Sequence, residues 1–309
     1  MPLIQVDARD TFPALHASPA PLLPALRHVL NGPACGSGAV TIMVHGFSYQ
    51  PGLPGHCPHD SLLSLAPRRT GPRLASWPQH LGFGRGARNE GLAIGFGWQA
   101  RGSIWQAHAE CTRAGHQLAR LAESVKRLAP DRPLHVVGHS LGARVALCAL
   151  AGAEAGSFDR LILMTPADHA ANAAAALASP AGRGVEVLHV ASGENLVFDQ
   201  LLQRLVPPPV PGDRIMGLDP DPLPNLARLR IDCAETLAAL RHAGFPVAPP
   251  LRRICHRSPY LRPGLFPLYR AFLAGAPDLA ALRRMLAPRA RTRRAAGRGP
   301  HPQAATLPA

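Results

Sequence analysis

Residues 134–147 read LHVVGHSLGARVAL. The apolar start of this stretch favours a buried strand, whereas residues 141–153 have the composition of a helix. Between them stands Ser140, flanked by Gly138 and Gly142, which remove side chains that would collide in a tight turn. A G-x-S-x-G pattern between a strand and a helix is typical of a nucleophilic serine held at a strained backbone angle. The alternative is an ordinary turn between a strand and a helix.

Strand and helix patterns alternate along the rest of the chain. A short apolar run without the apolar–polar alternation of a half-exposed strand predicts a buried strand. Besides 134–138, such runs occur at 39–44, 91–98, 160–165, 185–192 and 227–232. Apolar residues at helical spacing predict helices at 109–129, 141–153 and 169–178. Strands that alternate with helices imply the α/β class, with a mostly parallel central sheet and helices on both faces.

The composition divides the chain into one domain with two flanking segments. Residues 39–282 form the predicted α/β domain, and residues 1–38 are expected to be an irregular N-terminal lead-in. Residues 283–309 contain no acid and several arginines, which predicts a basic, disordered tail. Within the domain, the segment 47–90 is long and rich in Gly, Pro and His, and we expect it to form part of a pocket or a lid.

The net charge of +14 says little about partners. Every basic residue except Lys126 is arginine, and Ala, Pro and Gly are abundant, so the charge reflects the overall composition. We expect no specific nucleic-acid partner, although the tail could contact an anionic membrane or nucleic acid weakly. No apolar run is long enough for a transmembrane helix, and the N-terminus is a poor signal peptide, so we expect a cytoplasmic protein. The sequence does not indicate an oligomeric state.

A second stretch fits the chemistry of a nucleophilic serine. Residues 43–49 read MVHGFSY and end the first strand of the domain. Acyl transfer through a serine creates an oxyanion that needs two well-placed N–H donors. We predict the backbone amides of Phe47 and Leu141 as these donors, with Gly46 allowing the backbone to approach. The alternative is that Gly46 merely ends a strand.

The motifs VHGF and GHSLG, in this order and with a helix between them, resemble those of the α/β-hydrolase superfamily. The lipase/esterase-like branch with a His-Gly oxyanion loop is the most similar, and the resemblance covers about residues 39–275. It implies an eight-stranded, mostly parallel sheet, a catalytic order of serine, acid and histidine, and no cofactor. The expected activity is hydrolysis of a carboxylic ester or thioester through an acyl-enzyme. The alternatives are an acyltransferase or a non-catalytic binding protein of the same fold.

The resemblance places the catalytic histidine in a loop after the last strand. His242, His256 and His301 follow residue 232. His301 is in the tail, and His242 lies near the end of a predicted helix, where a cation is often structural. His256 precedes an amphipathic segment, and we predict it as the general base. The alternative is a surface histidine without a catalytic role.

The acid that would orient the histidine is harder to assign. The resemblance predicts an aspartate three residues after Gly193, but Leu196 stands there. Three carboxylates remain candidates, ranked Asp199, then Glu194, then Asp168 from the preceding strand end. The structural alternatives are helix capping or ion pairing for Asp199 and helix capping for Asp168.

Three other patterns attract weaker hypotheses. The HCPHD run at 56–60 has metal-ligating residue types but lacks a second half of a ligand set, so we predict no metal site and expect a share in the substrate pocket. The glycines at 82–91 lack the strand-then-helix setting of a nucleotide-binding loop. Five aromatic residues are interpreted either as lining an acyl pocket or as core, namely Trp77, Phe83, Phe96, Trp98 and Trp105. Core is favoured for Phe96 and Trp98, which lie in or beside a predicted strand.

Overall fold

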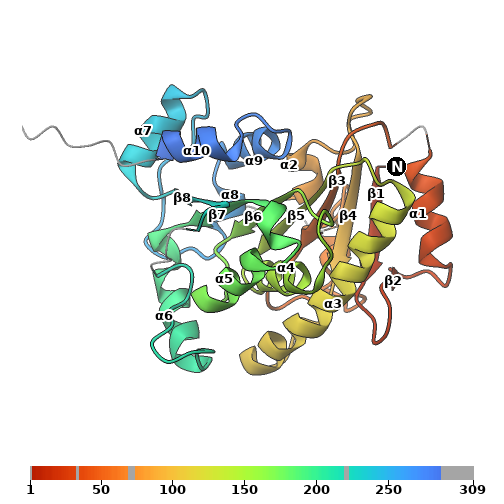
Figure 1. The fold of residues 1–309 in the computed structure, drawn as a ribbon, viewed down its shortest axis with the longest axis horizontal. Coiled ribbons are helices and arrows are strands. Elements are labelled where there is room, and N and C mark those ends of the chain that lie inside the picture. Colours follow the sequence, from red (N-terminus) through yellow and green to blue (C-terminus); the bar gives the residue numbers. More distant parts are fainter. Residues whose placement is uncertain (1, 33–34, 69–73, 219–222, 287–309) are drawn as a thin grey trace, which may run out of the picture.

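The computed structural model describes residues 2–32, 35–68, 74–218 and 223–286. A mostly parallel eight-stranded sheet runs through the centre of the molecule, with helices on both faces (Figure 1). Within it only β1 and β2 pair antiparallel. In their order across the sheet, the strands are β2 (Ala14–Leu15), β1 (Leu3–Asp7), β4 (Leu92–Gly97), β3 (Val40–Val44), β5 (Leu134–His139), β6 (Arg160–Met164), β7 (Glu186–Ala191) and β8 (Leu226–Arg230).

All six predicted strands are confirmed, with ends that differ by at most two residues. The prediction of an irregular lead-in over 1–38 was wrong. Strand β1 joins the sheet beside β4, with Leu3 opposite Ala93, and a helix follows at Leu22–Leu30. Gln5 and Asp7 interrupt the apolar residues of β1, so the segment shows no continuous apolar run, and its pairing with β4 identifies it as a strand.

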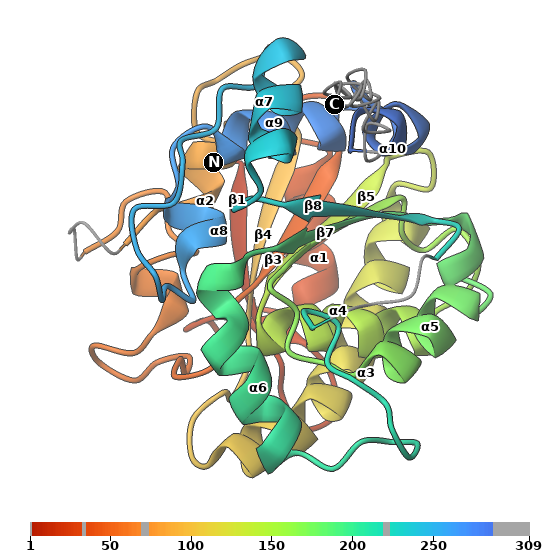
Figure 2. The same ribbon diagram turned by 90° about the vertical axis from the view of Figure 1, so that its left-hand side faces the viewer.

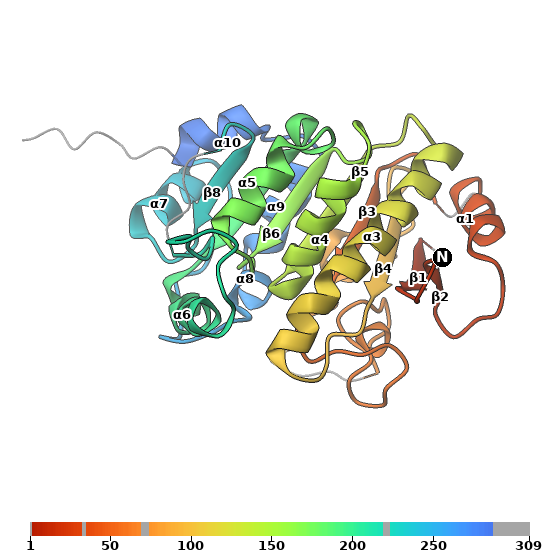
Figure 3. The same ribbon diagram turned by 60° about the horizontal axis from the view of Figure 1, so that its bottom comes forward.

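The helices cover both faces of the sheet, as Figures 1 and 3 show. One face carries α1 (Leu22–Leu30), α3 (Ile104–Leu128), α4 (Leu141–Gly152) and α5 (Ala170–Ala178). The other face carries α2 (Trp77–Leu81), α7 (Ala234–His242), α9 (Leu265–Leu273) and α10 (Leu279–Leu286). Figures 2 and 3 show α6 (Leu196–Leu205) beyond the end of the sheet where the parallel strands finish. The remaining helix, α8 (Ser258–Leu261), packs through Tyr260 into the core on the α9 side.

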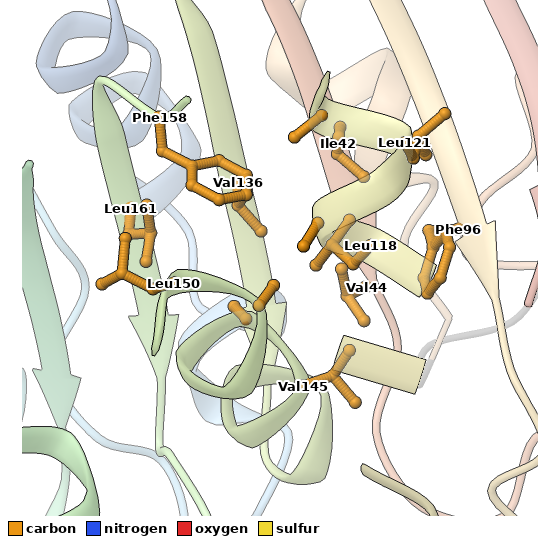
Figure 4. Packing of buried hydrophobic residues seen from close by; sticks show 14 of the residues in the cluster. Ile42, Val44, Phe96, Leu118, Leu121, Val136, Val145, Leu150, Phe158 and Leu161 are labelled. Carbon is orange, nitrogen blue, oxygen red and sulfur yellow. The ribbon is translucent and has the colours of Figure 1, made fainter. Parts of the chain in front are cut away.

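The core on the α3 and α4 side is built from interlocking aliphatic side chains (Figure 4). Leu118 of α3 and Val145 of α4 are fully buried, together with Ile42 and Val136 of the central strands. Burying a side chain of this size stabilises the fold by about 1.5–3 kcal/mol. This packing fixes α4, and with it the turn at Ser140, rigidly against the sheet.

Helix α3 begins earlier than the apolar spacing indicates. It starts at Ile104 rather than at 109, because Ser103 and Gln106 form a capping box. The Ser103 hydroxyl accepts a hydrogen bond from the Gln106 amide, and the Gln106 side chain accepts one from the Ser103 amide. Such reciprocal capping satisfies two amide donors at the start of a helix.

The segment 47–90 differs from the expected lid. It contains a 3₁₀ turn at Pro58–Asp60 and helix α2, and its Leu63 and Trp77 side chains are buried against the sheet. Only its first three residues line the cavity described below. Most of the described part of this segment is therefore a packed support for the start of the loop.

The predicted tail starts inside a helix. Residues 283–286 are the last turn of α10, and the Arg283 guanidinium donates to the carbonyl oxygen of Leu226 at the start of β8. Residues 287–309, which carry the rest of the predicted tail, lie outside the described residues. None of the helices that the structure describes has the length and apolarity needed to span a bilayer.

The strand order directs the loops of interest to one place. After β3 the chain crosses to β4 on one side and later returns to β5 on the other, so β3 lies between the two. The loops that leave β3 and β5 therefore start side by side at the carboxyl end of the sheet and then continue to opposite sides, which leaves a crevice between them. A crevice at this kind of switch point is where open α/β sheets bind ligands.

Candidate active site

Ser140 lies in the turn between β5 and α4 with φ of 55° and ψ of −122°, a backbone conformation that residues other than glycine rarely adopt. The surrounding backbone leaves no room for further side chains. A Cβ at Gly142 would lie 2.3 Å from the Val44 carbonyl oxygen, and one at Gly46 would lie 2.9 Å from that of His139. The two glycines therefore allow the loops after β3 and β5 to meet around Ser140. Such strain is characteristic of functional turns.

The loop after β3 is oriented by a buried histidine. His45 Nε2 accepts a hydrogen bond of 3.1 Å from the Trp98 amide, so Nδ1 carries the proton and donates to the Gly46 carbonyl oxygen at 2.9 Å. Burial lowers the pKa of His45 to about 3 and keeps the ring neutral. Because the carbonyl and the next N–H of a trans peptide point in opposite directions, the Phe47 amide is turned away from His45. In the described part of the chain, the amides of Phe47 and Leu141 have no hydrogen-bond acceptor.

A cavity of about 480 Å³ opens at this end of the sheet. All five residues that the sequence predicts for the site line it, namely Phe47, Ser140, Leu141, Asp199 and His256. Apolar side chains from the ends of α3 and α6 form much of the remaining wall, namely Ile104, Phe198, Leu201, Leu202 and Leu205. Residues 56–60, expected to share in the pocket, do not contribute to this lining.

His256 and the residue before it are held by contacts from the loop after β7 and from the end of β5. Its Nδ1 donates to the Asn195 Oδ1 atom at 2.5 Å. The Cys255 amide donates to the Glu194 carbonyl oxygen at 2.9 Å, and the His139 ring donates through Nε2 to the His256 carbonyl oxygen at 2.8 Å. Burial lowers the pKa of His256 to about 4, so the ring is neutral at pH 7. With Nδ1 donating, Nε2 is the nitrogen that can accept a proton.

The carboxylate ranked first in the sequence does not touch the histidine. Asp199 lies one step further back, where its Oδ1 accepts a hydrogen bond of 2.8 Å from Asn195 Nδ2. The orientation of the Asn195 amide follows from this pair, because an ionised carboxylate accepts only from the NH₂ group. Asp199 is 5% exposed, and burial raises its pKa to about 7. The prediction that Asp199 orients His256 is thus corrected to an indirect contact through Asn195.

The other two candidate acids are engaged elsewhere. Glu194 pairs with the buried Arg262 and accepts a hydrogen bond of 3.0 Å from the Ser192 hydroxyl. Asp168 pairs with Arg144 and accepts from the His169 amide at 2.8 Å. Neither lines the cavity with His256. Their roles in the described structure are to anchor the loops that follow β7 and β6.

Asn195 is the site residue that the sequence analysis missed. The resemblance pointed to a carboxylate as the partner of the histidine, although a neutral amide fills this position in Cys-His-Asn sites. Its position two residues after Gly193, in the loop where the acid was sought, is the signal that could have identified it.

The remaining histidine and aromatic candidates lie away from the chemistry. His242 ends α7, and His301 lies outside the described residues. Trp77, Phe83, Phe96 and Trp98 are buried in the core. Trp105 is half exposed, and its indole N–H donates to the Leu205 carbonyl oxygen at 2.7 Å.

The arrangement contains the parts that acyl transfer requires. A strained serine shares a cavity with a neutral imidazole that is fixed through Nδ1 and with two backbone N–H groups that have no acceptor among the described residues. Comparisons of the sequence with known protein families and with curated proteins found no match.

Proposed function

We propose that this protein is a serine hydrolase of the α/β-hydrolase fold that cleaves a carboxylic ester or thioester with an apolar acyl group. One observation carries the proposal. Ser140, at positive φ, and His256, anchored by Asn195 through Nδ1, line one cavity. The eight-stranded, mostly parallel sheet and the position of the serine between β5 and α4 support the fold assignment.

The proposed reaction proceeds in two halves. Ser140 Oγ attacks the acyl carbon while its proton moves to His256 Nε2, and the amides of Phe47 and Leu141 stabilise the oxyanion. The intermediate collapses when the carbon–oxygen or carbon–sulfur bond breaks, and the imidazolium protonates the leaving alcohol or thiol. Water then attacks the acyl-enzyme with His256 as base, which releases the acid and restores the serine.

Asn195 takes the third position in this proposal. Its Oδ1 keeps His256 in the tautomer that has a free lone pair on Nε2, and it accepts a hydrogen bond from the imidazolium that forms during reaction. Asp199 acts behind it by holding the amide in the required orientation. A carboxylate in direct contact would stabilise the imidazolium more strongly, so we expect a moderate rate.

The walls of the cavity support an apolar acyl group. Phe198, Leu201 and Leu202 project from α6 into the lining, and Phe198 and Leu201 are 39% and 51% exposed. Apolar side chains left open to solvent beside a polar reactive centre are typical of a site whose ligand covers them. Short- to medium-chain acyl esters fit this wall better than charged acyl groups.

Labelling by a fluorophosphonate probe tests the nucleophile. We expect the wild type to be labelled and to hydrolyse p-nitrophenyl butyrate, and Ser140→Ala to lose both properties. Ser157→Ala is a matched control, because Ser157 is equally buried but lies outside the cavity. Equal labelling of the wild type and Ser140→Ala would reject Ser140 as the nucleophile.

The neutral amide beside His256 favours one second candidate, a non-catalytic protein that binds an acyl ligand in the same cavity. Under this alternative the wild type binds a fatty acid or acyl ester but neither reacts with the probe nor turns over. Hydrolysis that depends on Ser140 would exclude it.

A further inference from the structure

A second cluster of polar side chains lies outside the cavity, where the N-terminal strands meet the segment 47–90. Asp7 ends β1, His16 follows β2, and His59 belongs to the 3₁₀ turn Pro58–Asp60. The Asp7 carboxylate contacts both rings, with Oδ1 2.8 Å from His59 Nε2 and Oδ2 2.9 Å from His16 Nδ1. The sequence alone offered only half of a ligand set in HCPHD, and the fold supplies the other half from a segment more than forty residues earlier.

The three side chains have the spacing of metal ligands. Their ligand atoms all lie within 4.8 Å of one another. Imidazole and carboxylate ligands bind Zn²⁺ at about 2.0–2.2 Å, which puts neighbouring ligand atoms of a tetrahedral site about 3.3–3.5 Å apart. Small side-chain rotations would therefore open the hydrogen-bonded cluster into a coordination site. For most pairs of ligand atoms they change the distance between the two atoms by about 1 Å or less.

The cluster is enclosed rather than a chance surface group. Asp7 and His59 are 5% and 3% exposed, and His16 is partly buried. The backbone makes room for it at Gly97, where a Cβ would lie 2.6 Å from His59 Nε2 and 2.9 Å from Asp7 Oδ1. Buried charged groups are usually paired or bound to a metal, and here one carboxylate and two imidazoles, all of them ligand types, meet in little solvent.

We propose that Asp7, His16 and His59 bind one Zn²⁺ ion through a carboxylate oxygen, Nδ1 and Nε2, with water in the fourth position. The exposed Arg9, whose guanidinium is 3.9 Å from Asp7 Oδ2, swings away when the ion enters. Two histidines and one carboxylate are a donor set that Zn²⁺ accepts readily, and they neutralise part of its charge.

Cys57 adjoins this site without belonging to the ligand set. Its sulfur lies 3.8 Å from His16 Nε2, the ring nitrogen opposite to the proposed ligand atom, and accepts from the Gly52 amide at 3.4 Å. A metal on Nε2 of His59 leaves the proton on Nδ1, a buried nitrogen with no partner in the described structure. We therefore expect weaker binding than at a closed four-ligand zinc site.

The ion would tie the N-terminal strands to the loop that follows β3. The Gln5 side chain already donates to the His59 carbonyl oxygen at 3.0 Å, so the two segments are in contact without the metal. Zinc at this position would stabilise the segment 47–60, whose first residue is Phe47. It does not enter the proposed acyl transfer.

Metal binding to the full-length protein tests the proposal directly. The protein is stripped with a chelator and titrated with Zn²⁺ in competition with a chromophoric chelator, and with Co²⁺ while visible absorption is recorded. We expect about one Zn²⁺ per chain, a rise in Tm on adding Zn²⁺, and the absorption of four-coordinate Co²⁺ with nitrogen and oxygen ligands.

Variants identify the ligands. His59→Gln and Asp7→Asn should lose the Co²⁺ absorption and the Tm response, whereas His56→Gln, which alters an exposed histidine of the same loop, should keep both. Failure of the stripped wild type to bind Zn²⁺ would overturn the proposal even if the variants do not fold. Unchanged binding in both ligand variants would overturn it as well. These readouts do not depend on esterase activity, so they stand whether or not Ser140 is a nucleophile.

Discussion

Replacement of Asn195 by alanine isolates the contact on which the proposed catalysis depends. The variant removes the acceptor 2.5 Å from His256 Nδ1. In the ground state this is a neutral hydrogen bond, but in the transition state the donor is an imidazolium. A hydrogen bond to a charged group is worth about 1.5–3 kcal/mol. At about 1.4 kcal/mol for each factor of ten, we expect kcat to fall about 10- to 150-fold.

Steady-state kinetics with p-nitrophenyl butyrate measure this loss. We expect the change mainly in kcat, because the hydrogen bond strengthens only as charge develops on the ring. Asn225→Ala is the control, since Asn225 also makes a part-buried hydrogen bond, to the Gly182 carbonyl oxygen, but does not line the cavity. A Tm within a few degrees of the wild type would show that both variants fold.

Exchange of the two partners sharpens the test. Asn195→Asp combined with Asp199→Asn puts a carboxylate next to His256 and an amide behind it, and we expect activity equal to the wild type or higher. Asn195→Asp alone places two carboxylates within hydrogen-bond distance, which raises the pKa of the pair and lowers activity at neutral pH. If Asn195→Ala keeps kcat within about threefold of the wild type between pH 6 and 9, the proposed role of Asn195 is wrong.

Four further predictions concern protonation and the oxyanion loop. Burial raises the pKa of Asp199 from 3.8 to about 7, so its contribution to stability is full below pH 4 and declines by about 4 kcal/mol as the pH rises through 7. Asp199→Asn should therefore gain Tm relative to the wild type from pH 5 to 9, and a constant Tm difference would contradict this. Because ionised Asp199 holds the Asn195 amide, wild-type kcat/KM should rise with pH through about 7, and Asp199→Asn should lack this limb. His189 is fully buried, neither ring nitrogen has a partner among the described residues, and burial lowers its pKa to about 3. Its contribution to stability is therefore full above pH 6.5 and falls by about 2 kcal/mol at pH 5. His189→Leu should raise Tm more at pH 5 than at pH 8, and an equal gain at both pH values would refute this. His45→Leu should release the Gly46–Phe47 peptide and lower kcat about 100- to 1,000-fold with little change in KM, measured with the same ester, whereas undiminished activity would remove Phe47 from the oxyanion site.

The sheet and its layers could be predicted from the sequence because burial on both sides leaves a local signature. Strands such as 40–44 and 134–139 are continuous apolar runs, and the helices between them show apolar residues at helical spacing. The turn at Ser140 was also predictable, since its positive φ requires small neighbours within two residues on each side. These features depend on residues close together along the chain.

The partners of the histidine depended on tertiary structure. The sequence offered carboxylates in the loop after β7, but which residue of that loop reaches His256 is decided by where α6 starts and by the hydrogen bond from Cys255 to Glu194. These place Asn195 against the ring and Asp199 behind it. No local pattern encodes such a contact between residues sixty positions apart.

What the sequence by itself determined is the order of strands and helices, the strained serine turn and the glycine-containing loop that faces it, because each follows from short-range sterics and from the periodicity of burial. What only the tertiary structure decided is the set of long-range pairs: β1 beside β4, Asn195 between His256 and Asp199, and the meeting of Asp7, His16 and His59. Their physical reason is that hydrogen-bond partners are selected by the packing of whole elements, to which each single residue contributes little.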